Sequence, residues 1–348
     1  GSSSSSSFAY ANDKVSTGLH HTCAILDNGD LKCWGYDSYG QLGDGGSNTN
    51  TNAPSSTAID LGTGRTAVAV SAGLHHTCAI LDNGDLKCWG QDDNGQLGDG
   101  GTNTNINAPS STAIDLGTGR TAVAVSAGAS HTCVILDNGD VKCWGLDNYG
   151  QLGDGGPLWN SNSPTDTNAP SSTAIDLGTG RTAVAVSAGY YHTCAILDNG
   201  DLKCWGSDQY GQLGDGGSAV SINSPSSTAI DLGTGRTAVA VSAGLYHTCA
   251  ILDNGDLKCW GRDNYGQLGD GGTNTNINAP SSTAIDLGTG RTAVAVSASA
   301  YHTCVILDNG DVKCWGLDQY GQLGDGGSNT NTNAPSSTAI DLGTGRTA

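Results

Sequence analysis

One pattern recurs six times along the chain, and it restricts the possible folds more than any other feature. The first cysteine of each copy stands at position 23, 78, 133, 194, 249 or 304, so the step is 55 residues four times and 61 residues once. The longer step contains an insertion at 157–166, which lies in a polar loop and leaves the flanking pattern intact. A fixed period of this length is typical of propellers and solenoids, in which each copy forms one supersecondary unit.

Alternation of side chains, β-branched residues and turn residues predicts four strands in each copy. In the second copy we expect them at 66–72, 76–81, 85–89 and 111–116. No stretch of the sequence shows a helical period. The sequence therefore predicts an all-β fold.

The two middle strands form a hairpin whose turn also predicts a disulfide. Asp27-Asn28-Gly29 suits a three-residue loop with Gly29 left-handed, and counting outward from it places Cys23 opposite Cys33. Regular pairing of cysteines favours disulfides and an oxidising compartment, while buried reduced thiols are the alternative. The predicted bridges are Cys23–Cys33, Cys78–Cys88, Cys133–Cys143, Cys194–Cys204, Cys249–Cys259 and Cys304–Cys314.

The two ends of the sequence complement each other. Residues 10–18 align with 65–73 and supply the small first strand that the last copy lacks, while the sequence stops at 346–348, where that strand would begin. This complementarity predicts a closed β-propeller of six four-stranded blades over residues 11–348, with a seven-bladed ring as the alternative. Residues 1–10 are expected to be a flexible Ser-rich segment.

Three short motifs in each copy resemble the regulator of chromosome condensation repeat, in the cysteine-bearing form found in secreted microbial proteins. In the first copy the motifs are His21-Thr22-Cys23-Ala24-Ile25-Leu26, Gly29-Asp30-Leu31-Lys32-Cys33-Trp34-Gly35 and Gly40-Gln41-Leu42-Gly43. The resemblance implies a propeller with four-stranded blades that recognises proteins, through nucleotide exchange on a small GTPase, chromatin binding or enzyme inhibition. The best-known members have seven blades, and no specialised exchange-factor loop can be matched residue by residue here.

The composition argues against several classes of partner. The net charge is −19, and all 33 acidic residues are Asp, so nucleic acid and anionic membrane surfaces are unfavourable partners. No apolar stretch approaches the roughly 20 residues of a membrane-spanning helix. We expect a monomer, extracellular or at the cell surface, with no cofactor.

Residues that recur in every copy are interpreted as structural. One histidine recurs in each copy, and six histidines arranged around a common axis suggest a metal site. Equivalent atoms on separate blades lie too far apart for zinc, so we expect these histidines to form hydrogen bonds to nearby backbone. The tryptophans after the second cysteine are expected to pack between blades, and the Asp-rich loops around Asp37, Asp44, Asp99 and Asp154 to form turns rather than calcium sites. The histidines are His21, His76, His131, His192, His247 and His302.

Positions that differ between otherwise similar copies are the candidates for function. They lie just before each histidine and just after each Trp-Gly, where several copies carry tyrosine. The candidate ligand-binding residues are Tyr190, Tyr191, Leu245, Tyr246, Tyr301 and the inserted Trp159. We interpret the chain as a non-enzymatic module that binds a protein or glycan. The alternatives are a structural or adhesive repeat without a ligand, and a guanine-nucleotide-exchange-type regulator.

Overall fold

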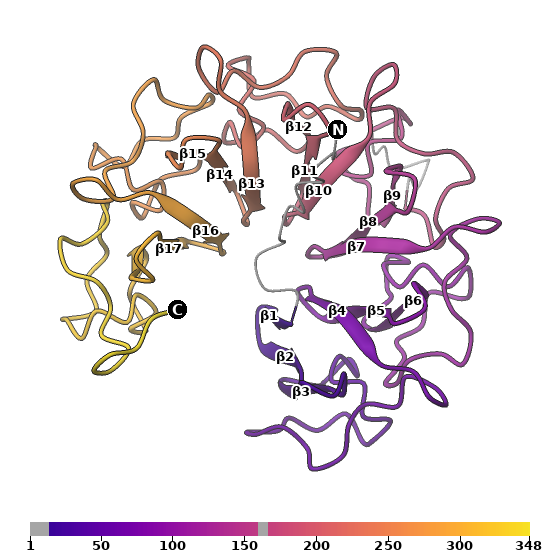
Figure 1. The fold of residues 1–348 in the computed structure, drawn as a ribbon. Helices are drawn as coiled ribbons and strands as arrows, with labels where there is room; N and C mark the ends of the chain where they lie inside the picture. The colour runs from indigo at the N-terminus through magenta and orange to yellow at the C-terminus, as the bar shows by residue number, and fades with distance from the viewer. Residues whose placement is uncertain (1–13, 159–165) are drawn as a thin grey trace, which may run out of the picture.

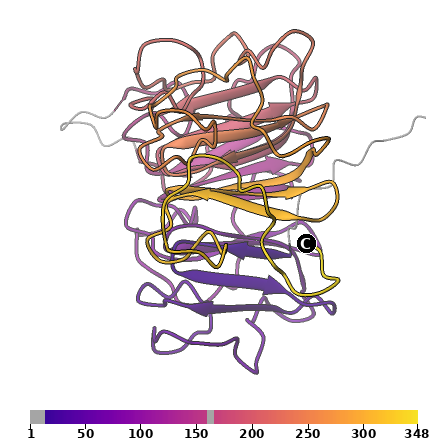
Figure 2. The ribbon, with the colours of Figure 1, turned by 90° about the vertical axis from the view of Figure 1, so that its left-hand side faces the viewer.

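The computed structural model describes residues 14–158 and 166–348. These residues contain no helix, and therefore none that could cross a membrane, and their strands form six separate three-stranded antiparallel sheets. The sheets are blades that follow one another around a central axis (Figure 1) and appear as stacked layers from the side (Figure 2). The all-β propeller with six blades is thus confirmed.

Each blade contains an inner, a middle and a third strand in chain order. The inner strands lie nearest the axis in Figure 1 and are β1 (Val15–Thr17), β4 (Ala67–Ala72), β7 (Ala122–Ala127), β10 (Ala183–Ala188), β13 (Ala238–Ala243) and β16 (Ala293–Ala298). The middle strands are β2 (His21–Ile25), β5 (His76–Leu81), β8 (His131–Leu136), β11 (His192–Leu197), β14 (His247–Leu252) and β17 (His302–Leu307). The third strands are β3 (Leu31–Gly35), β6 (Leu86–Gly90), β9 (Val141–Gly145), β12 (Leu202–Gly206), β15 (Leu257–Gly261) and β18 (Val312–Gly316).

The hairpin between the middle and third strands has the predicted register. Cys23 lies opposite Cys33, and Gly29 has a φ of 84°, the left-handed conformation that the three-residue turn requires. All six predicted cysteine pairs form disulfides. The turn geometry inferred from the sequence is therefore correct.

The predicted fourth strand is wrong. Residues 111–116 run beside the third strand, but only the Ile114 N–H donates to Leu86 O within this range, and an isolated bridge joins Gly90 to Ile106. Nearby backbone N–H groups are bound locally instead, since Thr112 donates to the Ser110 hydroxyl and Gly117 to the Asp115 carboxylate. Such side-chain acceptors compete with a sheet ladder, so each blade has three strands.

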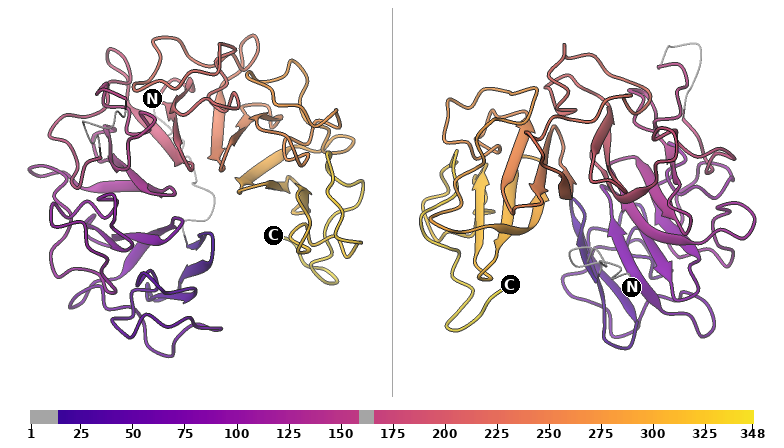
Figure 3. Two further views of the ribbon diagram at one scale, coloured as in Figure 1. Left: turned by 180° about the vertical axis from the view of Figure 1, so that it is seen from behind. Right: turned by 45° about the horizontal axis from the view of Figure 1, so that its top comes forward.

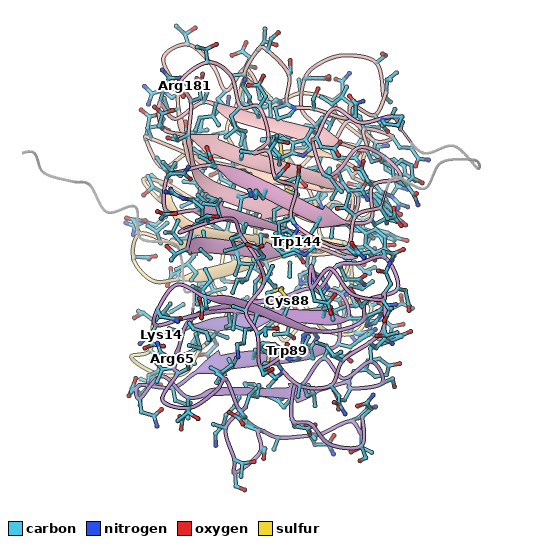
Figure 4. All side chains as sticks on the ribbon, turned by 90° about the vertical axis from the view of Figure 1, so that its right-hand side faces the viewer. Lys14, Arg65, Cys88, Trp89, Trp144 and Arg181 are labelled. Carbon is cyan, nitrogen blue, oxygen red and sulfur yellow. A yellow bond between two sulfur atoms is a disulfide. The ribbon has the colours of Figure 1, made fainter. Side chains whose placement is uncertain are left out.

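Neighbouring blades are joined by a set of contacts that every interface repeats. Trp89 is fully buried against the loop after β3, and its indole Nε1–H donates to Gln41 O at 3.1 Å. Gly43 is needed there because it has a positive φ and a β-carbon would collide with the Trp89 ring. In Figure 4, Trp89 and Trp144 lie within the stack of blades, whereas Arg65 and Arg181 lie at its rim. The tryptophans therefore pack between blades, as predicted.

The ring is open between the sixth and first blades, contrary to the predicted closure. No hydrogen bond joins described residues of these two blades, and the views along the axis show them apart (Figures 1 and 3). The Ala348 N–H bonds to Gly310 O, as the Ala67 N–H bonds to Gly29 O between the first and second blades, and no sheet of the described residues contains strands from both chain ends. The six blades of the described residues therefore form an open arc (Figure 1).

The sixth copy carries a sequence change that fits this opening. In the other five copies a glycine precedes the variable pair, and a β-carbon on Gly73 would collide with Gly128 O of the next blade. The sixth copy has Ser299 at this position, and no described blade follows it. The Ser299 side chain is tolerated because no carbonyl of a described neighbouring blade lies against it.

Candidate functional site

The loops that join inner and middle strands place variable residues around the mouth of the ring. Each loop is held by a short backbone bond, such as the Gly73 N–H to His76 O at 2.9 Å, so its two tip residues have a fixed position. These tips surround a central cavity of about 690 Å³, whose lining includes Leu19, Leu74, Tyr190, Leu245, Tyr246 and Tyr301. Smaller cavities beside Lys32, Lys142 and Lys203 occupy equivalent places in different blades and therefore belong to the repeated scaffold.

Seven tyrosines form a cluster across the third to sixth blades, made of five rings in contact with one another and the separate pair Tyr265–Tyr301. An outer tyrosine of one blade contacts an inner tyrosine of the next: Tyr149 with Tyr191 at 4.8 Å and Tyr210 with Tyr246 at 4.9 Å between ring centroids. We call this cluster the tyrosine band; its members are Tyr149, Tyr190, Tyr191, Tyr210, Tyr246, Tyr265 and Tyr301. The two variable positions of the repeat thus build one surface.

One cation completes the tyrosine band. The Arg262 guanidinium lies over the rings of Tyr210, Tyr246 and Tyr301, at 5.0, 5.3 and 5.6 Å from their centroids. These distances are within the range of cation–π attraction. Arg262 therefore links tyrosines of three successive blades.

Burial changes the acidity of the band. Partial burial, reinforced by Tyr190 and its hydrogen bond, raises the pKa of the Tyr191 hydroxyl above its ordinary value. Burial also raises the pKa of Tyr246, while Arg262 acts in the opposite direction. Both hydroxyls therefore remain protonated at neutral pH, and the oxygen of a tyrosine hydroxyl can still accept a hydrogen bond.

The candidate residues from the sequence occupy one region, with one exception. Tyr190, Leu245, Tyr246 and Tyr301 line the cavity, and Tyr191 packs edge-on against Tyr190 at 4.3 Å. Trp159 lies outside the described residues. The structure therefore brings five candidates together, while their role in binding remains a prediction.

Sequence reasoning missed two features of this face. Arg262 occupies one of the variable positions just after a Trp-Gly but is not among the candidates predicted above, although it is the only charged residue at its position among the copies. A second aromatic cluster joins the first two blades and contains His20, Tyr36, Tyr39 and His75, with Tyr39 and His75 at 4.8 Å. These residues come from the two variable positions, before the histidine and after the Trp-Gly. Comparing the residue after the Trp-Gly of one copy with the residue before the histidine of the next copy would have found them.

The buried histidines hold neighbouring blades together. His76 Nε2 lies 2.9 Å from the Thr132 hydroxyl, which itself donates to Gln96 O at 2.8 Å. The histidine must therefore donate, and burial lowers its pKa to about 3, which keeps it neutral. The expected structural role is right, but the partner is a threonine of the next blade rather than nearby backbone.

The buried aspartates have a similar structural role. Asp92 Oδ1 accepts from the Leu97 N–H at 2.9 Å, and burial raises the pKa of Asp92 to about 6. Asp44 Oδ1 accepts from the Gly46 N–H at 2.8 Å, which is a turn contact. Within the described part of the chain, no three His, Cys or Asp side chains form a possible metal site.

The sequence matches the model of one family along almost its whole length. That family is the RCC1-like domain, which matches residues 5–347. The ultraviolet-B receptor UVR8 of Arabidopsis thaliana is 30% identical over 315 residues, covering 90% of this chain and 67% of the receptor. The human E3 ubiquitin-protein ligase HERC2 is 29% identical over 309 residues, but the match covers 88% of this chain and only 6% of the ligase.

Solved structures show the same fold. Yeast RCC1 (Prp20) bound to Kap60 superimposes with a TM-score of 0.77 at 21% identity, covering 94% of this chain and 74% of that one. Human WBSCR16 gives a TM-score of 0.77 at 20% identity, covering 94% of this chain and 81% of that one. The repeated motifs, the blades and the family match agree, and the chain belongs to the RCC1-like domain family.

Proposed function

We propose that this chain is a non-enzymatic binding module that recognises a protein or glycan through the tyrosine band. The observation that carries the proposal is the placement of seven tyrosines along one arc of blades, three of them lining the central cavity, at positions where otherwise similar copies differ. Tyrosine provides a large contact area with little loss of side-chain entropy. A rigid frame that presents variable aromatic residues is suited to recognition.

The distribution of perturbed ionisable groups supports a binding role over catalysis. The buried histidines and aspartates recur from blade to blade with the same partners, as His76–Thr132 and His192–Thr248 illustrate. An active site needs different groups in separate roles at one place. Proteins of the same fold bind partners: a solved structure of yeast RCC1 contains Kap60, and Prp20p was characterised for its binding to Gsp1p and histones.

An extracellular or cell-surface location and a monomeric state are part of the proposal. Six disulfides support an oxidising environment, because cytosolic reductants keep most thiols reduced.

The test is a glycan array combined with a pull-down read by mass spectrometry. We expect the Tyr190→Ala, Tyr191→Ala double variant to lose binding, with each central tyrosine contributing about 2 kcal/mol. Tyr320→Ala is the matched control, since Tyr320 is 82% exposed. Ligand-induced protection from hydrogen exchange confined to the Asn-rich loops near 101–105 would overturn the proposal, and reproducible absence of any ligand would favour a structural repeat.

A further inference from the structure

Arg262 differs from the arginines of the scaffold. Five arginines at the start of inner strands pair with an aspartate of the same blade, for example Arg65 with Asp82 at 3.1 Å. Arg262 forms no ion pair with any residue in the described ranges. Other copies carry an uncharged residue here, including Leu146 and Leu317, so the blade does not require this charge.

The hydrogen-bonding capacity of Arg262 is not used within the described protein. Its Nε is buried and has no hydrogen-bond partner, and its contacts with three tyrosines are made through ring faces. Stacking occupies the flat side of a guanidinium and leaves the N–H groups along its edge as donors. The three tyrosines therefore fix the position of the guanidinium, and its edge N–H groups can donate hydrogen bonds to an oxyanion.

The cation is one residue removed from the wall of the central cavity. Arg262 is not among the residues that line the cavity of about 690 Å³, but Tyr246 and Tyr301, which do line it, contact the guanidinium. A ligand in the cavity that packs on these two rings therefore has Arg262 as its nearest cation among the described band residues. A carboxylate can accept two parallel hydrogen bonds from a guanidinium, which gives direction as well as affinity.

We propose, building on the binding function above, that this site takes a sugar that carries a carboxylate. The pyranose ring packs against Tyr246 and Tyr301, the carboxylate accepts hydrogen bonds from Arg262, and the hydroxyls meet tyrosine hydroxyls and loop backbone. One uronate brings one negative charge to one guanidinium. An acidic peptide would extend beyond the cavity. Its further negative charges would then be repelled by a protein of net charge −19, so we do not expect such a ligand.

The experiment compares galacturonic acid, which carries a single carboxylate, with its methyl ester, which has the same sugar ring without the charge, by isothermal titration calorimetry. We expect the wild-type protein to bind the acid at least about tenfold more tightly than the ester. Arg262→Leu introduces the residue already present at Leu146 and Leu317. We expect it to lower the affinity for the acid to that for the ester and to leave ester binding unchanged. The control Arg291→Leu removes a paired scaffold arginine and should preserve the preference.

Each other outcome contradicts the proposal. Equal affinity for acid and ester in the wild type, or an acid preference that persists in Arg262→Leu, overturns the assignment to Arg262 while leaving the binding function intact. Binding of neither sugar also overturns it, whereas the binding function itself is judged by Tyr190→Ala, Tyr191→Ala on the array. Arg262-dependent binding of a free peptide carboxylate, but not of its amide or of the uronate, would assign the site to peptides.

Discussion

In the second to sixth blades, the buried threonine of the middle strand joins groups from two blades. Thr132 accepts a hydrogen bond from His76 and donates one to Gln96 O, so one hydroxyl binds two groups of the preceding blade. Thr22 is the equivalent residue of the first blade, but it is partly exposed and no described blade precedes it. The same residue type therefore has two different environments in one molecule.

Replacing Thr132 by Val tests this connection. The substitution keeps the shape but leaves His76 Nε2 without its acceptor and removes one of the two donors to Gln96 O, which keeps the Trp144 indole N–H, so we expect a loss of roughly 1–3 kcal/mol. The measurement is the midpoint of urea unfolding. Thr22→Val is the matched control and should change stability by less than about 0.5 kcal/mol. Equal losses in the two variants would show that the hydroxyl does not act through the neighbouring blade.

The buried histidines predict a specific dependence on pH. Burial lowers the pKa of His131 from 6.5 to about 3, so the unfolded chain binds the proton more readily. The stability contributed by neutral His131 is therefore full above pH 6.5 and decreases as the pH falls toward 3. The buried aspartates act in the opposite direction, since burial raises the pKa of Asp147 to about 7 and the folded chain gains its proton first.

A His131→Gln variant separates these two effects, because it leaves the aspartates unchanged. We expect the stability advantage of the wild type over the variant to shrink by about 1–2 kcal/mol between pH 7 and pH 5. His302→Gln, at the open side of the ring, should show a smaller change because His302 is less buried. Parallel pH curves for wild type and His131→Gln would contradict a neutral buried histidine.

At the scale of one element, the disulfide-closed hairpin is the most independent part of a blade. Cys78 and Cys88 are buried, and the bridge spans ten residues of sequence. A loop this short limits the entropic effect, so we expect the Cys78→Ala, Cys88→Ala pair to lose about 2–3 kcal/mol or less. A non-reducing peptide map checks the pairing, and a bridge between cysteines of different copies would contradict it.

The elements that the sequence predicts well are those whose signals are local. The turn at Asp27-Asn28-Gly29 determines the register of its hairpin within a few residues, and the prediction of the Cys23–Cys33 pair is correct. The segment 111–116 also has β-branched residues, but nearby Ser and Asp side chains bind backbone N–H groups. Strand propensity alone does not measure that competition.

At the scale of the whole molecule, the open ring predicts uneven protection. Strands β8 and β17 have the same sequence, HTCVIL, but β8 is buried along its whole length whereas β17 alternates between buried and partly exposed residues. We expect faster amide hydrogen exchange in β17 than in β8, because fewer packed neighbours protect its hydrogen bonds. Identical sequences remove differences in intrinsic exchange rate. Equal protection of the two strands would indicate that the sixth blade is covered in solution.

Long-range geometry limited what could be predicted about the ring and the site. The sequence shows that its two ends complement each other. The angle between blades, however, depends on packing around Trp89 and its equivalents, so closure of the ring could not be deduced. Ser299 in place of glycine was the available signal of an open side. For the site, the tyrosines were predictable from their variability, while the position of Arg262 over three rings required the structure.

The contacts between blades also give the molecule a polarity. Every interface runs one way: the histidine and the Gln carbonyl belong to one blade, and the threonine and tryptophan to the next. The two open sides are therefore unlike, with His302 and Gln322 on one and Thr22 and Trp34 on the other. Pairing one open side with the same side of a second copy would place carbonyl against carbonyl or indole against indole. Contacts of the kind seen between blades can therefore form only head to tail, with the histidine side of one copy against the threonine side of another.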